Sequence, residues 1–143
     1  MTIEYKDRFK FRSWHEELHK MIDVKQVGHE NPFWMDDTGK WWAVTNLMQC
    51  IGLKDKNGKF MYEGDIVKCI TESLDEYIDQ IVYQNQNYFN SYPGFDLISN
   101  QQDSNGISYY LANGKIEVIG NIYENPELSR KMVKKSKQDF LNL

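Results

Sequence analysis

The segment that most constrains the fold of this chain is residues 52–67, which read GLKDKNGKFMYEGDIV. Residues 56–59, Lys-Asn-Gly-Lys, give the strongest turn signal, because Asn and Gly tolerate the positive φ angles of a type I′ hairpin turn. Residues 63–65, Glu-Gly-Asp, predict a second turn, in which glycine permits the bend and the aspartate caps it. The β-branched residues that follow predict a central strand at 66–70. This segment therefore indicates short antiparallel strands joined by tight turns.

Similar short stretches recur along the chain, with turn residues at the roughly 8–12-residue spacing typical of β-barrels. Two segments leave alternatives open: 13–23 contains good helix formers, and 107–111 fits either a strand or a short turn of helix. The polar residues after Pro126 favour a helix. The predicted strands are 9–14, 21–27, 41–45, 47–51, 66–70, 77–83, 95–98, 107–111 and 116–122.

These elements predict a mainly β fold of the β-rich α+β class. We expect a small SH3-like β-barrel at residues 46–125, because a Gly-Asp turn that opens a β-branched strand recurs in such barrels. Residues 1–45 would form an appended β-hairpin unit, and residues 126–143 a C-terminal helix with a basic tail. This expectation concerns architecture and carries no function by itself.

The composition narrows the class of protein. Aromatic residues make up 14% of the chain, which suits a pleated β-surface, and only 27% of residues are charged, which argues against global disorder. No apolar run is long enough to span a bilayer, so we expect no membrane partner. Cys50 and Cys69 lack metal-type spacing, and we expect small buried thiols that stay reduced in the cytoplasm.

Charge is unevenly distributed along the chain. The formal net charge is -4, yet residues 130–143 carry five basic side chains and one aspartate, which leaves about -8 on the remainder. A nucleic-acid coat is more often basic overall. The basic tail is best explained as the solvated face of a terminal helix, and a contact arm that includes Lys134 and Lys135 is the alternative.

Three stretches of this chain carry a family resemblance: residues 10–14 with Lys20-Met21, residues 47–49 with 52–67, and residues 116–128, which read IEVIGNIYENPEL. In these stretches the chain resembles the YopX family of phage and prophage proteins of Gram-positive bacteria. The resemblance implies a phage-type accessory protein with a β-rich, SH3-like barrel. It supplies no catalytic residue, because the family has no established biochemical activity.

One stretch formally matches a zinc-hydrolase motif. His15-Glu16-Glu17-Leu18-His19 has the H-E-x-x-H spacing, which on a helix would place both histidines on one face with Glu16 as general base. No long apolar-faced helix surrounds it, so a solvated turn is the better interpretation. Asp55 and Asp65 are likewise best explained as turn carboxylates rather than metal ligands. We therefore expect no enzyme activity, cofactor or metal.

Aromatic residues suggest a nucleic-acid alternative. Small β-barrels bind single strands by stacking bases on exposed rings beside a basic groove. The candidate rings are Tyr62, Tyr83, Tyr88, Phe89 and Tyr92, and the candidate cations are Lys54, Lys56, Lys59 and Lys68. Core packing of these rings is the plainer explanation, and the acidic body of the chain supports it.

The tryptophans favour protein association instead. Adjacent Trp41 and Trp42 on one strand must face opposite sides, so one of them meets a second layer, another subunit or solvent. We expect a non-enzymatic interaction or assembly module that forms a homo-oligomer or binds a phage or host protein. The candidate interaction surface comprises Trp34, Trp41, Trp42, Tyr88, Phe89, Tyr92, Lys134 and Lys135.

Overall fold

The fold is taken from a computed structural model, which describes residues 10–24, 26–27, 33–35, 38–43, 46–84, 94–98 and 106–131. The chain divides into two compact units, residues 1–53 and 54–143. The domain boundaries expected from the sequence, 1–45, 46–125 and 126–143, stay a prediction. Among the described residues, no helix is long and apolar enough to cross a membrane.

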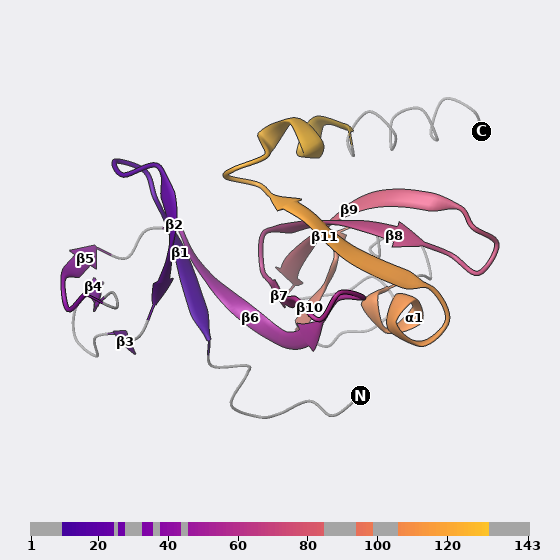
Figure 1. The fold of residues 1–143 in the computed structure, drawn as a ribbon, viewed down its shortest axis with the longest axis horizontal. Helices are drawn as coiled ribbons and strands as arrows, with labels where there is room; N and C mark the ends of the chain where they lie inside the picture. The colour runs from indigo at the N-terminus through magenta and orange to yellow at the C-terminus, as the bar shows by residue number, and fades with distance from the viewer. Residues whose placement is uncertain are drawn as a thin grey trace. The chain divides into compact units, whose positions relative to one another are not determined.

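The first unit contains two small antiparallel sheets (Figure 1). In one, β1 pairs with β2 on one side and with β6 on the other. In the other, β4 lies between β3 and β5. The strands are β1 (Phe11–His15), β2 (Lys20–Val24), β3 (Gln26–Val27), β4 (Phe33–Met35), β5 (Trp41–Ala43) and β6 (Leu47–Lys54).

Residues 13–23 form the β1–β2 hairpin, so the helical alternative for this segment is wrong. Its polar turn occupies residues 16–19, and His19 adopts a positive φ of 51° that ends any helical path. Trp14 lies opposite Met21 and is buried. The pairing of β1 with strands on both sides satisfies its backbone hydrogen-bonding groups and buries the Trp14 ring. This stabilisation outweighs the local helix propensity of the segment.

The second unit contains a curled antiparallel sheet, a half-barrel of order β10-β9-β8-β11. The predicted central strand is β8, which pairs with β9 and β11. A short helix at 126–131 follows the last strand, so the expected mainly β class with a short C-terminal helix is confirmed. The elements are β7 (Phe60–Tyr62), β8 (Asp65–Ile70), β9 (Glu76–Gln84), β10 (Gly94–Leu97), α1 (Ile107–Ala112) and β11 (Lys115–Asn121).

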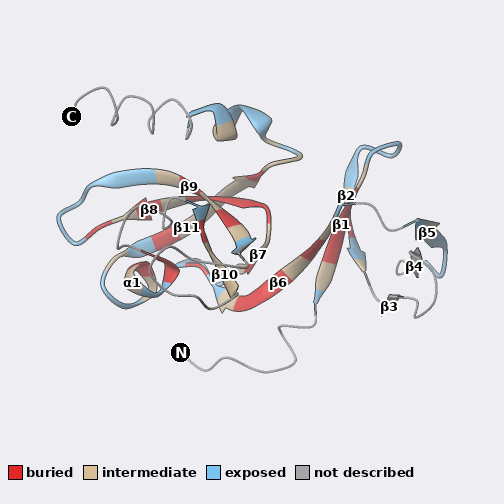
Figure 2. Ribbon diagram, turned by 180° about the vertical axis from the view of Figure 1, so that it is seen from behind, coloured by how far each residue is buried: buried red, intermediate tan, exposed pale blue. Residues whose placement is uncertain are grey.

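Buried residues are concentrated on β8, whereas β11 is mostly half-buried, as Figure 2 shows. Ile66 and Val67 are neighbours on β8 and point to opposite faces, yet both are fully buried. Both faces of the strand are therefore covered at this end, as expected where a sheet curls over its own core. The buried apolar side chains of this unit are Met61, Ile66, Val67, Cys69, Ile81, Leu97, Ile107, Tyr110 and Ile116.

The turn at residues 55–59 is present, but it is not type I′. Gly58 has φ of 80°, whereas Asn57 is not among the residues with positive φ, and type I′ requires both. The bonds Gly58 N–H to Asp55 O (3.0 Å) and Asp55 N–H to Lys59 O (2.8 Å) describe a type I turn followed by a left-handed residue. Asp55 favours this form because its Oδ1 accepts the N–H groups of Asn57 and Lys59.

Residues 120–126 form a second compact turn, at the end of β11. Asn121 Oδ1 accepts the N–H groups of Tyr123 and Glu124 (3.0 and 2.8 Å), and Asn125 Oδ1 accepts the N–H of Asn121 (3.2 Å). The Asn125 side chain lies so close to Gly120 that any Cβ there would clash with it. Pro126 then occupies the first helical position, where its fixed φ is favourable.

Residues 107–112 form helix α1, so the strand alternative for this segment is wrong and the helical one is confirmed. Ile107 and Tyr110, three residues apart, are both buried, which is helical rather than strand spacing. Asp96 Oδ1 accepts the N–H of Ile107 at 3.0 Å, which satisfies one backbone donor at the start of the helix.

Candidate interaction surfaces

The clearest exposed aromatic residue of the first unit is Trp41 on β5, which is 50% exposed. Its neighbour Trp42 is half-buried. The ring of Trp42 makes an edge contact with His15 (centroids 4.2 Å apart), and Lys40 Nζ lies 3.9 Å from its centroid. Trp42 thus has neighbours that shield it, whereas Trp41 presents an indole to solvent.

The other residues of the predicted interaction surface are only partly described. Trp34 lies on β4 directly opposite Trp42 in the strand register. Its side chain lies outside the described part of the structure. Five other residues lie entirely outside the described part of the structure: Tyr88, Phe89, Tyr92, Lys134 and Lys135. Their participation in an interface stays a prediction.

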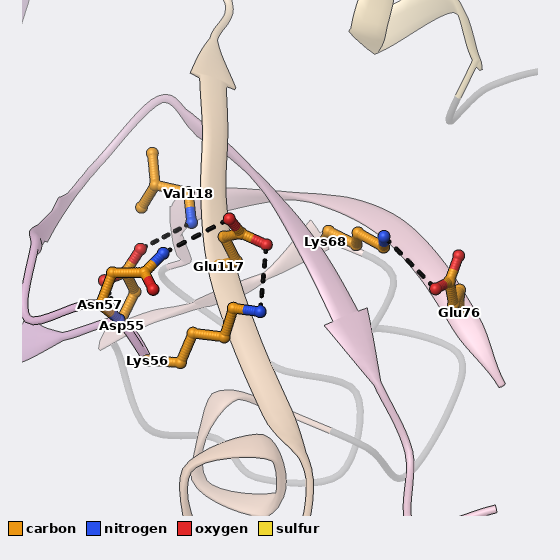
Figure 3. Close-up of polar contacts among 7 residues, drawn as sticks. All are labelled: Asp55, Lys56, Asn57, Lys68, Glu76, Glu117 and Val118. Atoms are coloured by element: carbon orange, nitrogen blue, oxygen red, sulfur yellow. Dashed lines mark hydrogen bonds and ion pairs between the residues drawn. The ribbon is translucent and has the colours of Figure 1, made fainter. Parts of the chain in front are cut away.

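Three of the four lysines proposed for a nucleic-acid groove have partners within the second unit, and the fourth, Lys59, is exposed. Lys56 Nζ lies 3.5 Å from Glu117 Oε2, and Lys68 Nζ lies 3.3 Å from Glu76 Oε1 (Figure 3). Lys54 Nζ lies 4.9 Å from the centroid of the Phe60 ring. Figure 3 also shows Asn57 reaching the other oxygen of Glu117. In the described part of the chain, Lys56 and Lys68 are therefore each neutralised in part by a carboxylate.

Tyr83 on β9 is an exposed ring that pairs across the sheet with Phe95 on β10. The two residues are register partners, and their ring centroids lie 5.3 Å apart in an edge-to-face contact. Tyr62 on β7 is half-buried. The Tyr83 ring therefore makes a cross-strand contact with Phe95, and the rest of the ring is exposed to solvent.

The H-E-x-x-H stretch lies in the β1–β2 hairpin and not on a helix. His15 and Trp14 are adjacent strand residues that face opposite sides. The His15 ring contacts Trp42, whereas the His19 ring contacts Trp14 at 4.9 Å. His15 Nδ1 also accepts the Leu18 N–H. The two imidazoles therefore lie on opposite faces, and the shared face that this zinc motif needs is not formed.

Both cysteines are free and buried, as the sequence predicted. Burial, and then the nearby negative charge of Asp79, raise the pKa of the Cys69 thiol far above its usual range. Burial raises the pKa of Tyr110 as well, with Cys69 and Asp79 adding to the effect. A thiol with such a raised pKa is a poor nucleophile, and Cys69 acts as a core residue.

The two longest sequence motifs meet in space. Asp55 Oδ2 accepts the N–H of Val118 at 2.9 Å, and the N–H of Lys56 donates to Ile116 O at 2.9 Å. The turn of residues 55–59 thus lies along β11 (Figure 3). Gly64 O accepts the N–H of Ile122, which ties the second turn to the end of the same strand. The motifs at residues 52–67 and 116–128 therefore have a structural role, because their residues bond to one another.

Comparison with known proteins agrees with this arrangement. The family model described as YopX protein matches residues 10–129, which includes both motifs. The chain belongs to the YopX family. No similar sequence is found among curated proteins.

One solved structure supports the fold of this YopX-family chain. The chain resembles the crystal structure of protein EF1440 from Enterococcus faecalis, with a TM-score of 0.62 and 24% sequence identity. The likeness covers 83% of this chain and 96% of the other. At this level of identity the likeness concerns the fold alone.

Sequence reasoning missed one exposed residue of the second unit. Leu74, between β8 and β9, is 78% exposed and has φ of 68°. No Gly or Asn in residues 71–75 marks the left-handed position, so the local sequence gave no sign that this leucine would adopt it.

Proposed function

We propose that this YopX-family chain is a phage or prophage accessory protein that acts by protein association, without catalysing a reaction. In this proposal it self-associates through β5 in the cytoplasm of the bacterial host. The observation that carries the proposal is the exposure of Trp41. A half-exposed indole on a sheet edge is costly in water, and tryptophan is enriched at protein interfaces.

The position of β5 supports a second copy of the chain as the occupant. In the described residues β5 is the last strand of the order β3-β4-β5, so one of its sides is a sheet edge. Two copies of an edge strand related by a two-fold axis can pair antiparallel and continue the sheet. Such pairing would bring Trp41 of each copy out of water. Because Lys56 and Lys68 are paired with glutamates, the charges do not favour nucleic acid as the partner.

The edge strand β11 of the second unit also supports β5 as the strand that associates. On β11, the N–H of Val118 and the carbonyl of Ile116 are bonded by Asp55 and Lys56, so this edge is covered. Covering an edge is a common device against unwanted pairing. The edge at β11 is therefore not free to pair with a second copy, whereas β5 carries an exposed tryptophan.

Single-stranded nucleic-acid binding has less support. Lys56 and Lys68 are paired with carboxylates, and these pairs would have to open before either lysine could contact phosphate. The test of this alternative is salt-dependent fluorescence anisotropy with labelled single strands. Submicromolar binding at low salt would replace the association proposal.

The experiment for the association proposal compares Trp41→Ser with Leu18→Ser by sedimentation velocity. Leu18 is a matched control, because it is 46% exposed in the same unit but lies on the β1–β2 turn rather than on β5. We expect a concentration-dependent oligomer for wild type and Leu18→Ser, and a monomer for Trp41→Ser. A wild-type protein that stays monomeric, or an oligomer that survives Trp41→Ser, would refute self-association through β5.

A further inference from the structure

Residues 71–75, between β8 and β9, form a well-bonded hairpin turn (Figure 1). Leu74 N–H donates to Thr71 O at 2.9 Å, and Thr71 N–H donates to Asp75 O at 3.0 Å. Thr71 Oγ1 accepts the N–H of Asp75 at 3.1 Å, and Ser73 Oγ donates to Asp75 Oδ2 at 3.1 Å. The turn is therefore held by its own backbone and side chains.

The same turn occurs at residues 55–59, where it provides an internal comparison. The two turns share the same pair of backbone bonds. The bond from Gly58 N–H to Asp55 O corresponds to the bond from Leu74 N–H to Thr71 O. The bond from Asp55 N–H to Lys59 O corresponds to the bond from Thr71 N–H to Asp75 O. The Asp55 carboxylate takes the place of the Thr71 hydroxyl in accepting the last N–H. The left-handed position holds glycine in one hairpin and leucine in the other, with φ of 80° and 68°.

Leucine is an unfavourable residue at this position for two reasons. Its Cβ strains the left-handed backbone, which glycine and asparagine tolerate. Its side chain is 78% exposed, so it gains almost nothing from burial in the isolated protein. A backbone outlier on a firmly bonded turn is the kind of observation from which a binding role can be inferred.

We propose that Leu74 is an anchor that inserts into an apolar pocket on a different protein, and that basic side chains surround that pocket. The surroundings of Leu74 decide the chemistry of the partner. Glu72, Asp75 and Glu76 are all exposed on the same hairpin, and the neighbouring Lys68 is paired with Glu76. This acidic surface complements a basic rim and disfavours nucleic acid. It also disfavours a second copy of the same hairpin, because like charges would meet.

The hairpin is positioned for such a role by helix α1. Tyr109 Oη accepts the N–H of Glu72 at 3.2 Å, and the Tyr109 ring packs edge-to-face against the buried Tyr110, with centroids 5.0 Å apart. The tip is thus tied to the core of the second unit. An anchor that is already ordered loses little conformational freedom on binding. This surface lies on the second unit, and the proposal does not depend on the association of β5.

The first test measures whether the leucine is strained. Leu74→Asn keeps the left-handed backbone without the strain and should raise Tm by about 4 °C. Leu74→Ala removes the side chain but keeps the strain and should leave Tm nearly unchanged. Gly58→Leu should lower Tm by a similar amount, because a Cβ at Gly58 meets nothing within 4 Å and only the backbone is strained. A lower Tm for Leu74→Asn would overturn the argument.

The second test identifies and measures the partner. The photo-reactive residue p-benzoylphenylalanine is placed at position 74, or at the equivalent position 58, in the full chain produced in its bacterial host. Each protein cross-linked from position 74 alone is purified and titrated by calorimetry. We expect its affinity to fall at least tenfold with both Leu74→Asn and Leu74→Ala, and to weaken with Glu72→Gln. No adduct, equal adducts from both positions, an adduct with a second copy of this chain, or unchanged affinities would overturn the proposal.

Discussion

Gly114 lies where the chain leaves helix α1 for β11, and no side chain fits there. A Cβ at this position would collide with the carbonyl oxygen of Ile70 and would lie 3.1 Å from the Tyr110 ring. The Ile70 carbonyl is part of the backbone of β8 and the Tyr110 ring is buried, so neither can move freely. The tight contact explains a glycine at the end of a helix without any need for positive φ.

Gly114→Ala is therefore expected to lower the free energy of unfolding by about 2 kcal/mol, the usual range for overpacking. Gly94→Ala is the matched control, because a Cβ there meets nothing within 4 Å. It should change stability by less than about 0.5 kcal/mol. Urea denaturation of both variants checks the prediction, and equal effects would contradict the packing at Gly114.

Cys69 makes stability depend on pH in the alkaline range. Below about pH 8.5 the thiol is neutral in both the folded and the unfolded chain and adds no dependence. Above that pH the unfolded chain loses the proton, while burial and Asp79 keep the pKa of the folded thiol raised. The unfolded state is then favoured, so stability falls as pH rises, by up to about 1.4 kcal/mol per pH unit.

The measurement is urea denaturation of wild type and Cys69→Ala between about pH 8 and pH 9.5. The variant is expected to be less stable at neutral pH, because it leaves a cavity, but to lose less stability as the pH rises. Parallel curves for the two proteins would show that Cys69 does not ionise on unfolding as described.

At the scale of the elements, the single side chain of Asp55 joins a turn to a strand. Its two oxygens accept three backbone N–H groups, those of Asn57, Lys59 and Val118, each at 2.9 Å. The first two bonds shape the 55–59 turn, and the third attaches that turn to β11. Asp55 is itself buried, so water cannot replace it easily.

Asp55→Ala should lower the free energy of unfolding by about 3 kcal/mol, because buried donors lose a charged acceptor. Asp55→Asn keeps the shape and one carbonyl oxygen, and we expect it to lose less. Chemical denaturation gives the free energies, and amide hydrogen exchange at Val118 reports the local bond. A loss below about 1 kcal/mol in Asp55→Ala, with unchanged exchange at Val118, would contradict this role.

Strands were more predictable from the sequence than turn types. Residues 66–70 and 116–122 carry dense β-branched patterns, and β8 and β11 form there. Residues 107–111 were ambiguous, because a short, mainly apolar stretch fits the periodicity of both a helix and a strand. The burial of Ile107 and Tyr110, three residues apart, decides in favour of a helix. Asn57-Gly58 is a common type I′ pair, but the two N–H groups that Asp55 Oδ1 accepts favour a type I turn with only Gly58 left-handed.

The candidate surfaces were less predictable than the elements. Trp41 could be singled out, because adjacent tryptophans on a strand cannot share one face. Its exposure and the shielding of Trp42 by His15 and Lys40 depend on contacts between separate strands. Leu74 could not be foreseen, because its strain follows from a turn geometry that glycine or asparagine normally signals.

The molecule as a whole combines a covered edge at β11, the exposed apolar side chains of Trp41 and Leu74, and the ion pairs of Lys56 and Lys68 with glutamates. The architecture of a family does not supply its activity. The family motifs of this chain are accounted for by contacts among Asp55, Lys56 and β11, and they need no catalytic explanation. We propose that the exposed Trp41 and Leu74 serve the binding of other proteins instead.

The most direct measurement of this account is the tryptophan emission spectrum at increasing protein concentration, taken as the difference between wild type and Trp41→Phe. This difference isolates Trp41 from the other three tryptophans. We predict that the Trp41 emission shifts to shorter wavelength as the protein associates, because the indole leaves water. A Trp41 emission that stays at the wavelength of a water-exposed indole at every concentration would contradict self-association through β5.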